Sequence, residues 1–154
     1  KHNTMASTIT AQNFTATIST QITLNGQPKV TENQLIISDV NEYDSRIMTI
    51  PTSSEVTVVQ FASAVAAGTF ISGDMKYLQI TNKDTVNYCR IRVKKNGADT
   101  FDTRLDAGKT FMMGNVKESV SATAAAFAAF ADADSINMQA YTAAVDIEYV
   151  VVSI

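Results

Sequence analysis

Few of the residue types that usually carry chemistry occur in this chain. Its 154 residues include one cysteine, one histidine and no tryptophan. A single cysteine excludes an internal disulfide and a multi-cysteine metal site. The histidine is His2, within a leader over residues 1–7, of which Lys1–Thr4 read as an expression remnant before Met5. No Ser–His or Cys–His pair is therefore expected, and we predict no enzyme activity, catalytic residue, metal or cofactor.

The chain also lacks long apolar runs and an excess of positive charge. No stretch approaches the roughly 18 apolar residues that span a bilayer, and nothing after Met5 resembles a signal peptide. The net charge of −3 argues against a nucleic-acid partner held by bulk charge. We therefore expect a protein made in the cytoplasm, with neither a membrane nor nucleic acid as its partner.

What the chain does contain is β-branched residues in alternating patterns. Hydrophobic residues make up 45% of the sequence, which is typical of a globular domain. Apolar and polar residues alternate over Phe14–Leu24, which predicts a strand with one buried and one solvated face. Asn25-Gly26 follows and predicts a tight hairpin turn, because both residues accept positive φ angles. The return strand is expected over Lys29–Ser38.

Further short strands follow at roughly regular spacing. The strands at Val86–Lys95, Thr100–Leu105 and Thr110–Met113 are expected to form a meander, and Ser135–Tyr141 and Val145–Ile154 a hairpin. Residues 115–131 fit either a short helix or an extended segment. The sequence thus predicts one all-β domain over residues 8–154, an antiparallel β-sandwich or jelly-roll-like fold with at most one short helix.

Val86–Lys95 carries the most distinctive surface pattern. Cys89, Ile91 and Val93 point to one side, and the other side carries a stripe of Tyr88, Arg90, Arg92 and Lys94. Cys89 is best explained as a small buried hydrophobe. The stripe has two interpretations that the sequence leaves open. It can bind an acidic partner surface, or it can pair with Asp102 on the facing strand.

Acidic residues offer two alternative sites, both of which the sequence disfavours. The pairs Asp102/Asp106, Asp132/Asp134 and Asp146/Glu148 could in principle run glycoside hydrolysis, but a solvated face explains them better. Asp132, Asp134 and Asn137 could supply calcium ligands, but the third ligand and the glycine of a calcium loop are missing.

Four motifs in the second half of the chain resemble a known group when taken in order. They are Leu78-Gln79-Ile80-Thr81-Asn82, Cys89-Arg90-Ile91-Arg92-Val93, Leu105-Asp106-Ala107-Gly108-Lys109-Thr110-Phe111 and Val145-Asp146-Ile147-Glu148-Tyr149-Val150-Val151. In this order they resemble small virion structural proteins of tailed bacteriophages, especially phages of cyanobacteria. The resemblance covers residues 78–154. It implies a β-rich, non-enzymatic particle component (capsid decoration, tail, or fibre knob) located in the virion, and it favours an extended segment over residues 115–131.

The last strand suggests self-association. Val150 and Val152 lie on one face and Tyr149 and Val151 on the other, so both faces are apolar. Such a strand is either central in the sandwich or covered by another molecule. On the second reading we expect a homotrimer or another small ring that also binds other virion proteins.

Two groups of opposite charge suggest how neighbouring copies would meet. The stripe of Tyr88, Arg90, Arg92 and Lys94 would face Asp146 and Glu148 of a neighbouring copy. The alternative function is a carbohydrate- or receptor-binding module. That function would need a concave site built from the scattered tyrosines Tyr43, Tyr77, Tyr88 and Tyr141.

Overall fold

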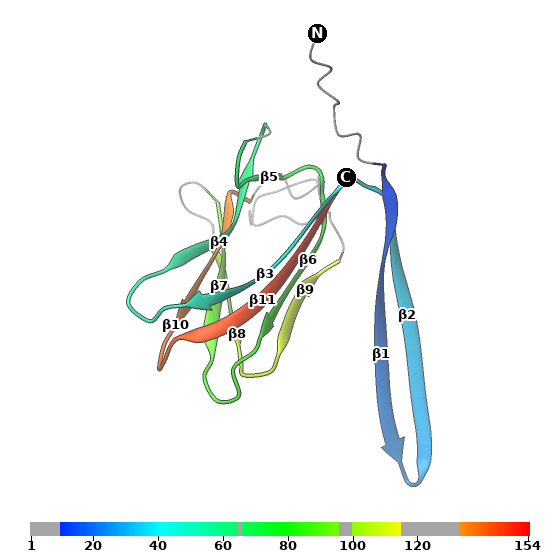
Figure 1. The fold of residues 1–154 in the computed structure, drawn as a ribbon. Coiled ribbons are helices and arrows are strands. Elements are labelled where there is room, and N and C mark those ends of the chain that lie inside the picture. Colours follow the sequence, from blue (N-terminus) through cyan, green and yellow to red (C-terminus); the bar gives the residue numbers. More distant parts are fainter. Residues whose placement is uncertain (1–9, 65, 96–99, 115–132) are drawn as a thin grey trace. The chain divides into compact units, whose positions relative to one another are not determined.

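The computed structural model describes residues 10–64, 66–95, 100–114 and 133–154. All regular structure in these residues is β-strand, which confirms the all-β prediction. The strands are β1 (Gln12–Leu24), β2 (Gln27–Val40), β3 (Glu42–Ile50), β4 (Val56–Ala62), β5 (Phe70–Ile71), β6 (Met75–Asn82), β7 (Cys89–Lys94), β8 (Thr100–Leu105), β9 (Thr110–Met113), β10 (Ser135–Ala140) and β11 (Val145–Ser153). Figure 1 labels them.

Contacts divide the chain into two compact units. One unit ends at Asn41 and the other comprises Glu42–Ser153. The sequence placed both in one domain over residues 8–154, whereas the sandwich itself begins at β3. Only Asn41 separates the end of β2 from the start of β3.

The first unit is a long antiparallel hairpin of β1 and β2. Its strands pair in one continuous register from Phe14 opposite Ile37 to Leu24 opposite Gln27. Asn25 and Gly26 form the turn with φ angles of 51° and 77°. Positive φ at both central residues fits the strongly twisted turn that two-residue hairpins favour. The predicted hairpin is therefore confirmed.

The second unit is sandwich-like, with two sheets whose apolar faces share one core (Figure 1). The five-stranded sheet has the order β5-β4-β10-β7-β8, and the four-stranded sheet has the order β3-β11-β6-β9. All pairings are antiparallel except that of β4 with β5. Alternation along each strand sends every second side chain inward. The largest fully buried side chains include Ile50, Leu78, Ile80, Ile91, Ile136, Met138 and Ile147.

The meander prediction is wrong in its third strand. β8 pairs with β7 as expected, but β9 belongs to the other sheet and pairs with β6. The connection between β8 and β9 forms backbone hydrogen bonds with the end of β6. The Asn82 amide donates to the Lys109 carbonyl at 2.9 Å, and the Gly108 amide donates to the Asn82 carbonyl at 3.1 Å. These bonds hold the start of β9 beside β6.

The hairpin predicted for the last two strands is also wrong. β10 lies between β4 and β7, whereas β11 lies between β3 and β6 in the other sheet. A central strand whose inner face meets the core needs apolar residues, which accounts for the buried Tyr149 and Val151. The inner face of this strand therefore requires no other molecule, and on its outer face Val152 is fully buried and Val150 is half-buried. Residues 115–131, for which helix and extended segment were both considered, lie outside the described residues.

Candidate functional site

The strongest concentration of charge lies on the outer face of the five-stranded sheet. β7 sends Cys89, Ile91 and Val93 into the core, as the alternation predicted, and leaves Arg90, Arg92 and Lys94 half-buried on the outside. β8 and β10 flank β7, so residues opposite these cations extend the same face. The basic stripe is therefore a real surface feature.

A single carboxylate gathers this stripe. Glu55 is the residue just before β4. Its Oε2 accepts a hydrogen bond from Arg90 Nη2 at 2.7 Å and another from Arg92 Nη1 at 3.2 Å. Lys94 Nζ forms an ion pair with Oε1, and Asn137 Nδ2 donates to the same oxygen at 3.2 Å. We call Glu55, Arg90, Arg92, Lys94 and Asp102 the ionic cluster.

Asp102 on β8 completes the ionic cluster. It lies directly opposite Arg92 and accepts two parallel bonds, from Nε at 2.7 Å and from Nη2 at 2.6 Å. This is the cross-strand pairing that the sequence offered as one of two readings of the stripe. With three cations and two carboxylates the cluster retains a charge of about +1, so most of its charge is satisfied within the chain.

The cluster changes the titration of its carboxylates. Burial raises the pKa of Glu55, but the hydrogen bond from Lys94 and the charges of Arg92 and Arg90 lower it by more, so the net pKa lies below its usual value. The hydrogen bonds from Arg92 likewise lower the pKa of Asp102. Both side chains are therefore held ionised, which suits ion pairing rather than proton transfer.

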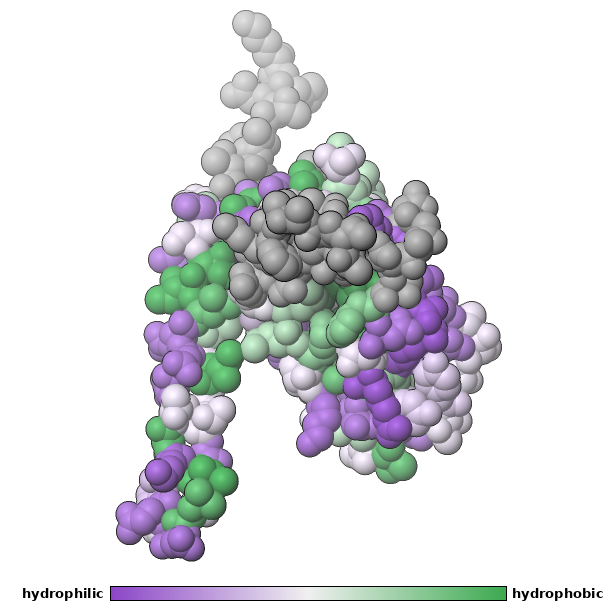
Figure 2. Space-filling view, turned by 180° about the vertical axis from the view of Figure 1, so that it is seen from behind, coloured by the Kyte–Doolittle hydropathy of each residue, from purple (hydrophilic) through white to green (hydrophobic). Residues whose placement is uncertain are grey.

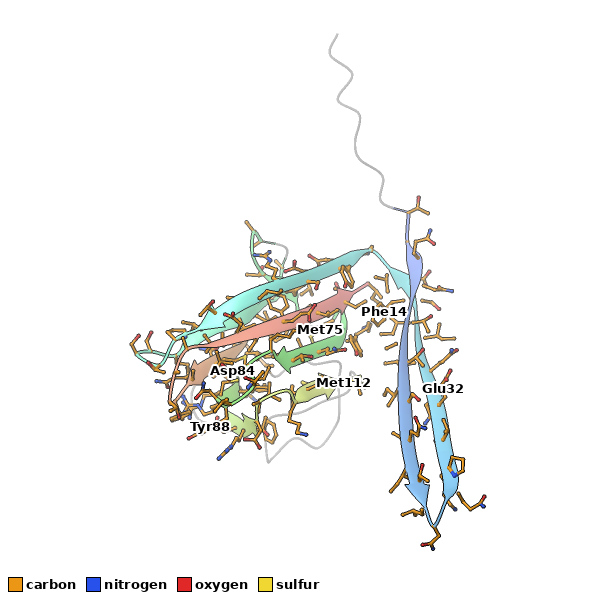
Figure 3. The ribbon with its side chains drawn as sticks, turned by 60° about the horizontal axis from the view of Figure 1, so that its bottom comes forward. Phe14, Glu32, Met75, Asp84, Tyr88 and Met112 are labelled. Carbon is orange, nitrogen blue, oxygen red and sulfur yellow. The ribbon has the colours of Figure 1, made fainter. Side chains whose placement is uncertain are left out.

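Two of the tyrosines that the sequence left scattered come together beside the cluster. Tyr88, labelled in Figure 3, stacks on Tyr141 with ring centroids 5.4 Å apart and planes 19° apart. The guanidinium carbon of Arg104 lies 3.8 Å from the Tyr88 centroid, and that of Arg90 lies 5.8 Å from the Tyr141 centroid. These side chains line a hollow of about 290 Å³. The expectation of dispersed aromatics is wrong for this pair.

The remaining two tyrosines do not join this hollow. Tyr77 is buried, with its hydroxyl donating to Gln79 Oε1 at 2.7 Å. Tyr43 is exposed on β3, at the edge of the other sheet. The hollow is therefore a two-tyrosine site with arginines at its sides.

Asp146 and Glu148 lie on the outer face of the four-stranded sheet, away from the ionic cluster. Asp146 accepts a hydrogen bond from Thr49 Oγ1 at 2.6 Å, and Glu148 pairs with Lys83 at 3.1 Å. Their neighbours Val145 and Ile147 point into the core from the opposite side. The six residues predicted as a partner-binding surface therefore lie on two different faces of the chain, so the stripe could meet Asp146 and Glu148 only on a neighbouring copy.

Glu55 is the residue that sequence reasoning missed. Its partners Arg90 and Arg92 lie 35 and 37 residues further along the chain. No periodicity or motif links positions so far apart, and an acidic residue at a strand entrance is common. Only the sheet order, which puts β4 and β7 on either side of β10, brings these groups together.

No metal centre is apparent in the part of the chain that the structure describes, since no three His, Cys, Asp or Glu side chains gather there. Of the calcium candidates, Asp132 lies outside the described residues. Asn137 is engaged with Glu55 and with Ser135, whose hydroxyl donates to Asn137 Oδ1 at 2.7 Å. Cys89 is fully buried, as predicted, and burial raises its thiol pKa to about 11.

Among the described residues, no helix has the length and apolar character that crossing a membrane would require. Comparison of the chain with protein-family models, with curated proteins and with solved structures finds no match. Function must therefore be argued from the sequence pattern and from the surfaces of the two units.

Proposed function

We propose that the chain is a structural, non-enzymatic component of a tailed-phage particle, such as a capsid decoration, tail or fibre protein. In this role it binds copies of itself and other virion proteins. The order of motifs over residues 78–154 supports the particle assignment. The observation that carries the assembly role is the β1–β2 hairpin, a separate unit whose apolar face has no second layer within the hairpin.

The hairpin supports assembly because an isolated two-stranded sheet is at best marginally stable in water. Ile18, Ile22 and Leu24, which alternate along β1 and so share one face, are 39%, 53% and 52% exposed. A sequence that keeps strict strand alternation there, with apolar residues on one face, is suited to a surface supplied by another protein.

The particle assignment is tested by mass spectrometry of purified particles of the phage whose genome encodes the chain. We expect its peptides at a fixed ratio to those of the major capsid protein through successive density gradients. If the chain is present in the infected lysate but lost from the purified particles, the assignment is overturned.

A second candidate function is binding of a carbohydrate or receptor at the hollow lined by Tyr88 and Tyr141. The stacked pair and the exposed Tyr141 favour it, since sugars pack on aromatic faces. Without tryptophan, the fluorescence of the five tyrosines reports directly on such binding. Titration with oligosaccharides should then change the signal in the wild type and in Tyr43→Ala, but not in Tyr141→Ala. No change in any of the three proteins excludes this function for the sugars tested.

A further inference from the structure

The hollow beside the ionic cluster is formed by three neighbouring strands. Arg104 on β8 lies directly opposite Arg90 on β7, and Tyr88 and Tyr141 lie next to each other at the adjoining ends of β7 and β10. The volume of about 290 Å³ lies at the lower end of the roughly 300–1,000 Å³ typical of pockets for small molecules. Figure 2 shows a broad hydrophilic area on the sandwich. The hollow therefore suits a small, polar ligand.

The side chains around the hollow offer hydrogen-bond donors that have no acceptor. Arg104 donates through Nε to Asp106 at 2.6 Å, and among the described residues nothing accepts from its Nη1 or Nη2. The hydroxyls of Tyr88 and Tyr141 likewise make no hydrogen bond within the described part of the chain. Arg90 Nε is a buried donor, also without an acceptor among the described residues. A ligand that accepts hydrogen bonds would satisfy part of this set.

The acceptors around the hollow are already engaged. Asp102 lines it, but its two oxygens accept hydrogen bonds from Arg92 Nε at 2.7 Å and Nη2 at 2.6 Å. Asp106 is bound by Arg104 Nε. Each hydroxyl of a neutral sugar is a donor as well as an acceptor, so a neutral sugar needs acceptors in its site. An ionised carboxylate only accepts, and it therefore matches this hollow better.

Arg104 presents the group that a carboxylate needs. The end of its guanidinium formed by Nη1 and Nη2 is free, and the parallel N–H groups there match the two oxygens of a carboxylate. The guanidinium carbon lies 3.8 Å from the Tyr88 centroid, so a cation–π contact helps to hold the side chain. Since the ionic cluster nearby retains a charge of about +1, the electrostatic potential at the hollow also favours an anion.

The tyrosine pair supplies an apolar surface beside this charge. Tyr141 is 47% exposed, and its stacking on Tyr88 fixes the position of both rings. Arg104 lies on Tyr88, which lies against Tyr141, so the guanidinium and the exposed ring belong to one continuous surface. The C–H groups of a sugar ring pack on such an aromatic surface. An inorganic anion would use the charge and leave the ring surface uncovered, whereas a sugar that carries a carboxylate uses both.

We propose that the hollow binds an acidic sugar, a hexuronic acid residue of a polysaccharide, with its ring against Tyr141 and its carboxylate on Nη1 and Nη2 of Arg104. The proposal rests on the carbohydrate-binding candidate function above and names the substrate class for it. Tyr141 contributes to the binding of any sugar in the hollow, and Arg104 provides the preference for acidic over neutral sugars.

The test compares matched ligands with the full chain. Isothermal titration calorimetry measures the affinity for oligosaccharides of galacturonic acid and of galactose of equal length, and for the corresponding pair from glucose. The wild type should bind the acidic member of a pair at least about tenfold more tightly, because its carboxylate adds charged hydrogen bonds. Arg104→Gln should reduce this preference to less than about twofold. Arg104→Lys should recover only part of it, since an ammonium group lacks the planar fork of a guanidinium.

Arg46→Gln is the matched control. Arg46 is 64% exposed and pairs through Nε with Asp44, as the 63% exposed Arg104 pairs through Nε with Asp106, but it lies on β3 in the other sheet. Its substitution should leave the preference for acidic sugars unchanged. Because both arginines are largely exposed, neither variant should unfold the sandwich, and thermal unfolding checks this.

The outcomes separate the substrate class from the function on which it rests. Equal affinity for acidic and neutral members, or a preference that persists in Arg104→Gln, overturns the acidic-sugar proposal and leaves carbohydrate binding at the hollow standing. If no oligosaccharide binds the wild type, both are overturned. Inorganic sulfate that binds as tightly as the acidic oligosaccharides would show a simple anion site, which also overturns the proposal.

Discussion

Removing the charge of Glu55 should weaken the sandwich, because this one side chain connects two strands of the five-stranded sheet and the loop before a third. It joins the loop before β4 to three cations on β7 and to Asn137 on β10. Glu55→Gln keeps the shape of the side chain and removes its charge. Asp102 would then be the single carboxylate of the ionic cluster. Arg92 would keep Asp102 as its partner, whereas Arg90 and Lys94 would lose the partner that they have in Glu55.

The magnitude follows from the burial of the cluster. Removing one partner from a fully buried ion pair costs about 3–5 kcal/mol. The Glu55 side chain is 16% exposed and the three cations are 21–36% exposed, so water screens part of this cost. We expect Glu55→Gln to lower the free energy of unfolding by about 2 kcal/mol and the melting temperature by roughly 6–10 °C.

Asp102→Asn is the matched control within the same cluster. Its side chain is 39% exposed and pairs with Arg92, which keeps Glu55 as a second partner. We expect a cost below about 1 kcal/mol. Thermal unfolding monitored by circular dichroism measures both variants. A Glu55→Gln protein that melts within about 2 °C of the wild type, or no lower than Asp102→Asn, would refute the importance assigned to Glu55.

The same substitution has a pH signature. Because the folded pKa of Glu55 lies below its unfolded value of about 4.3, the carboxylate contributes its full stabilisation above that pH. The contribution is lost as the pH falls through the lowered folded pKa. The stability difference between wild type and Glu55→Gln should therefore be constant near neutral pH and narrow below about pH 4.3. A difference that stays constant into strong acid would contradict this assignment.

Two further predictions concern buried groups. Asn82 is fully buried, and its side chain donates to the carbonyls of Asn87 at 2.9 Å and Leu105 at 3.2 Å. Asn82→Ala should cost about 3 kcal/mol in urea unfolding, because both acceptors lose their donor, and an unchanged midpoint would contradict this. Cys89 should react with a thiol reagent no faster than the sandwich unfolds, since burial raises its pKa to about 11. Labelling of the native protein at the rate of a free thiol would show that the cysteine is accessible.

Local features of the fold were predictable from the sequence. The Asn25-Gly26 turn and the alternation along β7 each depend on neighbouring residues, and both are confirmed. The pairing of Arg92 with Asp102 also follows from one hairpin connection. In each case the pattern and the contact lie within about ten to fifteen residues of each other, where turn chemistry and strand period determine the geometry.

Nonlocal features were not predictable. A short connection can return the chain to the same sheet or carry it across to the other sheet. The polar turn residues before β9 and β11 suit both outcomes, so they do not show which sheet the next strand joins. The meander and the last hairpin were therefore assigned to the wrong sheets. Glu55 and the Tyr88–Tyr141 stack depend on that sheet order, so no sequence pattern revealed them. The exposed apolar face of the hairpin was read as a core face, because alternation alone does not say which molecule covers it.

The claim that the hairpin is an assembly arm is tested most directly by hydrogen exchange at different protein concentrations. Amides of β1 and β2 should become more protected as the concentration rises through the range in which the chain self-associates, since a hairpin of two strands opens readily on its own. Amides of the sandwich core strands β6, β7 and β10 should keep the same protection throughout. Hairpin amides whose exchange rates do not depend on concentration would contradict the claim that another copy of the chain covers them.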